Sequence, residues 1–91
     1  MNKCLKITCQ IPAKPSGVMS SIQKVAKKYE VEGLVQLVEG EMKMVACGKK
    51  ENVDLFVDEL HAICIQDPDQ FLEVEPFLKD KDYRGVFRII E

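Results

Sequence analysis

The spacing of apolar residues changes period several times along this chain, and the order of these changes restricts the fold. Over residues 4–11 apolar and polar side chains alternate, which is the pattern of a strand with one buried face that ends at Pro12. From Val18 to Tyr29 apolar residues recur every three or four positions, which predicts an amphipathic helix. Ser20 and Gln23 could form a capping box if the helix begins there.

A hairpin and a second helix follow in the sequence. Residues 34–38 and 42–47 read as strands, and Glu39-Gly40 between them predicts a tight turn in which glycine supplies a positive φ. Beyond Gly48, apolar residues recur at positions i, i+3, i+4 and i+7, the spacing of one helix face. The residues of this face are Val53, Phe56, Val57 and Leu60.

Two more extended segments, 71–77 and 85–90, each follow a turn-rich stretch. The order strand, helix, strand, strand, helix, strand, with one additional C-terminal strand, predicts a ferredoxin-like α/β sandwich (α+β). In this βαββαβ fold both helices lie on one face of a mainly antiparallel sheet. The other face mixes polar and apolar side chains and is apolar enough for a contact surface. We expect it to carry Lys6, Thr8, Gln10, Lys43, Val45, Val86, Arg88 and Ile90.

Length and charge narrow the function classes. Residues 1–91 fit a single domain, and a hydrophobic content of 46% suffices for a modest core. The 13 basic and 15 acidic residues include no basic block, which argues against a nucleic-acid partner. No apolar run has the length of a signal segment or a membrane span. We therefore expect a cytoplasmic protein without membrane association, and the sequence predicts no cofactor.

The cysteines and acidic pairs offer little chemistry. The four cysteines lack a CxxC spacing, so we expect unpaired thiols that act as small core or surface residues. His61 and Cys64 could share a helix face, but two ligands do not make a metal site. Two carboxylate pairs lie in turn-like stretches, where aspartate favours local backbone bonding over calcium or acid–base work. These pairs are Asp67 with Asp69 and Asp80 with Asp82.

Three segments from residue 16 onward form a pattern that can be compared with known families: Ser16-Gly17-Val18-Met19, residues 23–28 and residues 33–37. With these segments, most of the chain resembles the acylphosphatase family. Ser16-Gly17-Val18-Met19 matches the V-G-F-R end of the loop that follows strand one in that family, and residues 23–28 match the helix after it. Residues 33–37 match the family's G-[WY]-V-x-N segment. The remaining matches are Gly40 at the hairpin, Gly48 at the end of the third strand, Val53, Phe56 and Leu60 on the second helix, and residues 87–89 in the closing strand.

The resemblance implies a phosphate site that this chain lacks. In acylphosphatases the loop arginine grips the phosphate together with loop N–H groups, and the asparagine positions the attacking water. The matching positions here hold Met19 and Leu37, which offer neither the planar charged fork nor the amide that these tasks need. Pro12 and Pro15 also lack the N–H that a phosphate cradle uses. We expect catalysis to be lost.

Three hypotheses remain open. The leading one is a non-catalytic acylphosphatase-like module that binds a protein partner, a second copy or a small ligand through the sheet face, an edge strand or the altered loop. The alternative is a small acylphosphatase that hydrolyses the carboxyl–phosphate bond of acyl phosphates, with Lys14, Ser16 or Gln36 replacing the missing groups. In that case Ser16, Gly17 and Val18 would hold the anion. The third is a ferredoxin-like domain that senses a ligand.

Overall fold

A computed structural model describes residues 2–11, 14–65, 70–78 and 83–90. The elements follow in the order β1 (Asn2–Gln10), α1 (Pro15–Lys28), β2 (Glu32–Val38), β3 (Glu41–Lys49), α2 (Lys50–Cys64), β4 (Leu72–Pro76) and β5 (Phe87–Ile90). Pro12 and the two predicted aspartate turns at Asp67, Asp69, Asp80 and Asp82 lie outside the described residues.

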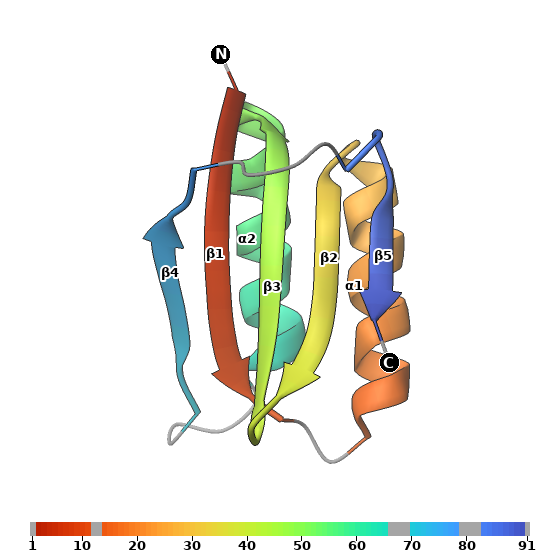
Figure 1. Ribbon diagram of the computed structural model, residues 1–91, viewed down its shortest axis with the longest axis vertical. Helices are drawn as coiled ribbons and strands as arrows, with labels where there is room; N and C mark the ends of the chain where they lie inside the picture. The colour runs from red at the N-terminus through yellow and green to blue at the C-terminus, as the bar shows by residue number, and fades with distance from the viewer. Residues whose placement is uncertain (1, 12–13, 66–69, 79–82, 91) are drawn as a thin grey trace.

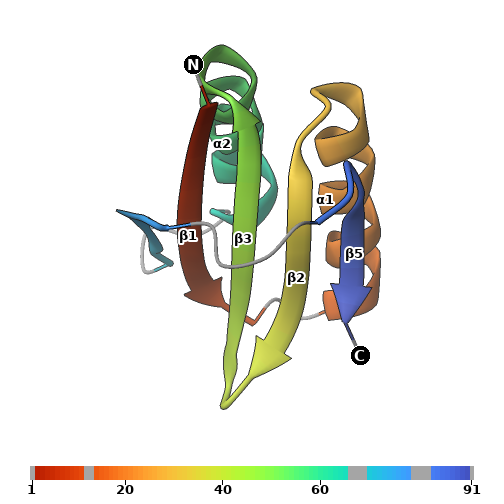
Figure 2. The same ribbon diagram turned by 45° about the horizontal axis from the view of Figure 1, so that its top comes forward.

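The strands form one sheet in the order β4-β1-β3-β2-β5. All neighbours are antiparallel except β2 and β5, which are parallel. Figure 1 shows α1 and α2 side by side against one face of this sheet, and the turned view of Figure 2 shows the same two layers. The predicted ferredoxin-like fold is confirmed. No helix in the described ranges is long and apolar enough to cross a membrane.

The core lies between the sheet and the helices. On β1 the buried residues Leu5, Ile7 and Cys9 alternate with half-buried or exposed ones, as the period-two pattern predicts. The rings of Phe56 on α2 and Phe87 on β5 lie 5.8 Å apart in this layer. Among the described residues no polar or charged side chain is buried. The other face carries the strand residues expected there, Lys6, Thr8, Gln10, Lys43, Val45, Arg88 and Ile90, and Val86 is exposed just before β5.

Two glycines explain the path of β2. Glu39 and Gly40 have φ values of 49° and 82°, so the predicted two-residue turn joins β2 to β3 with positive φ at both positions. Gly33 has a φ of 146°, and a Cβ at this position would overlap the backbone oxygen of Val45 on β3. Only glycine fits this close approach of the two strands.

The start of α1 differs from the prediction. The helix begins at Pro15, before Val18, and Lys14 is its N-cap without a side-chain cap bond. Proline suits the first helical turn because its missing N–H would have no intrahelical acceptor there. The conditional capping box does not form: the Gln23 side chain instead donates a hydrogen bond of 2.9 Å to the backbone oxygen of Phe87.

The expectation of four unpaired thiols is wrong for one pair. Cys4 and Cys47 form a disulfide on the sheet face that carries no helix. The register of β1 against β3 places the two residues directly opposite each other, with Cα atoms 4.2 Å apart. Cys9 and Cys64 are free thiols, as expected. The sequence pattern located both strands but did not fix their register, and the disulfide depends on register.

Candidate functional site

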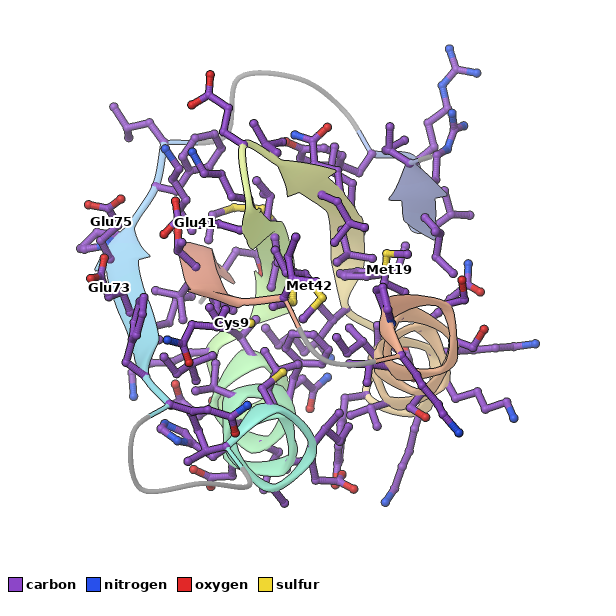
Figure 3. The ribbon with its side chains drawn as sticks, turned by 90° about the horizontal axis from the view of Figure 1, so that it is seen from below. Cys9, Met19, Glu41, Met42, Glu73 and Glu75 are labelled. Carbon is purple, nitrogen blue, oxygen red and sulfur yellow. A yellow bond between two sulfur atoms is a disulfide. The ribbon has the colours of Figure 1, made fainter. Side chains whose placement is uncertain are left out.

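The resemblance directs attention to the end of the molecule where β1 and β2 end and α1 begins (Figure 1). Figure 3 looks at this end from below and shows Cys9, Met19 and Met42 in the space between the sheet and the helices. All three belong to the same buried cluster. The interior at this end is therefore lined by sulfur-containing and aliphatic side chains.

The predicted anion-binding residues belong to the first turn of α1, and not to the loop before it. The first N–H groups of a helix have no intrahelical acceptors. Pro15 has no N–H group, so the free N–H groups at this helix start are those of Ser16 and Gly17. Val18 donates to the backbone oxygen of Lys14 over 3.3 Å. The first turn holds no acidic side chain, so the positive end of the helix dipole is not neutralised from within the helix.

The surroundings of this helix start are open. Lys14, Ser16 and Gly17 are exposed, and a Cβ at Gly17 would have no described atom within 4 Å. Val18 is half-buried and packs against the core. Among the described residues, the arrangement offers two backbone donors and the exposed Lys14 ammonium group at the surface.

Met19 is part of the core. Its side chain is 4% exposed, and it belongs to the same cluster as Ile22 and Met42. A methionine fills irregular space between packed elements because it is flexible and apolar. Its burial therefore shows that Met19 packs within the core.

Leu37 and Gln36 lie on opposite faces of β2. Leu37 shares the helix side with the buried Val35, lies beside Met42 in the register of β3, and is 41% exposed near the end of the strand. Gln36 points to the other face, beside Lys43 on β3 and Ile90 on β5. The structure thus places Leu37 on the same side of the sheet as Met19 and places Gln36 on the far side.

A thiol pair lies in this region that the sequence did not predict. Cys9 is 1% exposed at the end of β1, and Cys64 packs against the same core from the last turn of α2. The hydrogen bond from the Cys64 thiol lowers the pKa of Cys9, although burial acts in the opposite direction. The same bond, together with burial, raises the pKa of Cys64. Cys9 is buried and Cys64 is half-buried, and no sequence spacing could have revealed that the two thiols meet.

Solved structures with the same architecture include two acylphosphatases. The enzyme from Coxiella burnetii superposes with a TM-score of 0.81 at 21% identity, and the match covers 98% of this chain and 93% of that one. The acylphosphatase from Bacillus subtilis gives a TM-score of 0.72 at 18% identity and covers both chains completely, at 100% each. This chain has the acylphosphatase fold. No family model matches the sequence, and a search of curated proteins found no match.

The same fold also occurs inside a larger protein. Full-length HypF in its phosphate- and nucleotide-bound form matches all of this chain (100%) with a TM-score of 0.78 at 17% identity. The chain spans only 12% of that protein. At these identities the likeness shows the fold alone, because one fold supports many functions.

Proposed function

We propose that this chain is a non-catalytic binding or interaction module built on the acylphosphatase fold. The burial of Met19 is the observation that carries the proposal. The resemblance matches this position to the phosphate-gripping arginine, and here the side chain is an uncharged part of the core. Methionine cannot make the charge-assisted, bidentate hydrogen bonds that hold a phosphate.

The second matched position supports the same conclusion. Leu37 has no amide to orient a water, and Gln36 points to the far face of the sheet. Loss of one preorganised donor can reduce a rate by about 10²–10³. Losses of groups that act together do not add fully, yet loss of both the arginine and the asparagine leaves little rate enhancement to expect.

One observation favours a second candidate, a hydrolase that cleaves the carboxyl–phosphate bond of acyl phosphates. The start of α1 combines the Ser16 and Gly17 N–H groups with the nearby Lys14 ammonium, and its first turn holds no acidic residue. These groups could hold a phosphate dianion. Gln36, the residue suggested to replace the water-positioning asparagine, lies on the far face of the sheet from this helix start.

Hydrolysis of benzoyl phosphate by the purified protein tests the two candidates. We expect the wild type to match a heat-inactivated sample, and a Lys14→Ala variant to behave identically. The double variant Met19→Arg, Leu37→Asn asks whether the fold can be activated, and its thermal unfolding must be measured because an arginine replaces a buried side chain. Saturable turnover by the wild type that falls in Lys14→Ala would overturn the proposal and establish the hydrolase.

A further inference from the structure

A groove runs between α1 and the edge strand β5, far from the start of α1. β5 is the last strand in the sheet order, and Figures 1 and 2 both show α1 running beside it. The groove has a volume of about 970 Å³, which is within the usual range of ligand sites. Lys24 and Lys27 line it from α1, Glu30 lines it from the turn after α1, and Phe87 and Arg88 line it from β5.

The backbone of β5 presents hydrogen-bonding groups toward this groove. The Gly33 N–H on β2 donates to the backbone oxygen of Val86 over 2.9 Å, so Val86 directs its backbone groups toward β2. Successive residues of a strand direct their backbone N–H and C=O groups to alternate sides. Phe87 and Ile89 therefore direct theirs toward the open edge. The hydrogen bond from Gln23 to the Phe87 oxygen, at 2.9 Å, confirms this direction. A side-chain amide thus occupies a position that a partner strand's N–H would take.

The charge of the groove is positive although the chain as a whole carries a net charge of −2. Lys24 and Lys27 supply two cationic groups against the single carboxylate of Glu30. Arg88 borders the groove on β5, but its side chain belongs to the sheet face without helices. The floor of the groove is apolar and includes Ala26, Val31 and Phe87, all at most 7% exposed. Such a surface favours an extended chain that alternates carboxylates with apolar side chains.

The opposite edge of the sheet has the reverse character. On β4, Glu73 and Glu75 are exposed beside Pro76, and Figure 3 shows both glutamates at this edge. Charged side chains and proline on an edge strand oppose pairing with other chains. β5 has no proline, and it lies next to a basic groove.

We propose that the β5 edge and the adjoining groove bind an extended acidic segment of a partner protein as an added sheet strand. The inference deepens the proposed binding function and rests on it. Backbone pairing with Phe87 and Ile89 supplies the affinity, and Lys24 and Lys27 select carboxylates on the side chains that enter the groove. Gln23 gives up its bond to Phe87 when the strand adds.

The test uses a capped peptide that alternates glutamate and valine, with a lysine–valine peptide of equal length as the control. Binding is followed by NMR, together with amide hydrogen exchange at Phe87 and Ile89. We expect only the acidic peptide to bind and to protect these two amides. The double variant Lys24→Glu, Lys27→Glu should bind about tenfold or more weakly, because it turns two attractions into repulsions. Lys49→Glu changes an exposed lysine elsewhere and should bind like the wild type.

Several results would overturn the proposal that the β5 edge and the groove bind an acidic segment. These are equal binding of both peptides, no binding, affinity that is unchanged in Lys24→Glu, Lys27→Glu, or protection at β4 in place of β5. Each leaves the proposal of a non-catalytic module intact, because that proposal fails only on turnover of benzoyl phosphate. Circular dichroism of each variant serves to check that the fold persists, so that a loss of binding reports on the groove.

Discussion

The two faces of the sheet differ in how strictly they constrain their side chains. On the helix-covered face the strands bury Ile7, Val35 and Met44 to 1% exposure or less. The other face of the sheet holds lysines, glutamates and valines at half-buried or exposed positions. Each face also carries one cysteine pair, free thiols on the covered side and a disulfide on the other.

This difference shows where function can be placed in this chain. A side chain on the covered face is fixed by packing, because protein interiors tolerate little change in volume or charge. Met19 follows that rule, so the region matched to the acylphosphatase site contributes to the core. Positions that can recognise a partner without loss of stability are left at the sheet edges, on the exposed sides of the helices and on the sheet face without helices.

The largest loss of stability is expected where side chains are most tightly packed against the helix-covered face of the sheet. Phe56 is fully buried on α2, whereas its neighbour Leu55 is 47% exposed. Phe56→Ala should lower the free energy of unfolding by about 3–5 kcal/mol, since it removes apolar contacts and leaves a cavity. Leu55→Ala is the matched control and should cost less than about 1 kcal/mol. Urea unfolding of both variants measures the contrast, and equal losses would contradict the two-face comparison.

The disulfide on the other face should give the next largest effect. Replacement of Cys4 and Cys47 together by alanine should cost about 2–4 kcal/mol, mainly because the unfolded chain regains the freedom that the crosslink removes. Dithiothreitol should lower the melting temperature of the wild type and leave that of the double variant unchanged. A wild-type melting temperature that does not respond to the reductant would show that this bond does not stabilise the fold.

Much of the fold could be predicted because the spacing of hydrophobic residues along the sequence differs between strands and helices. The alternation in β1, the helical spacing of Val53, Phe56 and Leu60, and the Glu39-Gly40 turn were all identified correctly. The start of α1 was placed too late because Pro15 begins the helix without a capping side chain. Ser20 and Gln23, which suggested a start, lie inside the helix.

The site was less predictable because its features depend on pairing between distant segments. The disulfide requires the register of β1 against β3, and the Cys9–Cys64 thiol contact requires the packing of α2 on β1. The faces of Gln36 and Leu37 follow from strand alternation once β2 is established. The basic groove could not be seen in the sequence, because Lys24 and Phe87 border the same groove only when β5 pairs in parallel with β2.

The smallest effect is expected at the rim of the covered face, where Lys3 on β1 donates to Asp54 on α2 over 2.8 Å. This hydrogen bond, helped by the charges of Lys3 and Lys50, lowers the pKa of Asp54 from its usual 3.8. The ion pair therefore stabilises the fold above that pH and is lost as the pH falls through the lower folded-state value. Asp54→Asn should melt slightly below the wild type at pH 7, and the difference should vanish in acid. The contribution is small because both partners are solvated.

Asp58→Asn removes the same charge from an exposed position of α2 and serves as the control. A difference between Asp54→Asn and the wild type that persists undiminished in acid would show that the aspartate acts through packing and not through its charge.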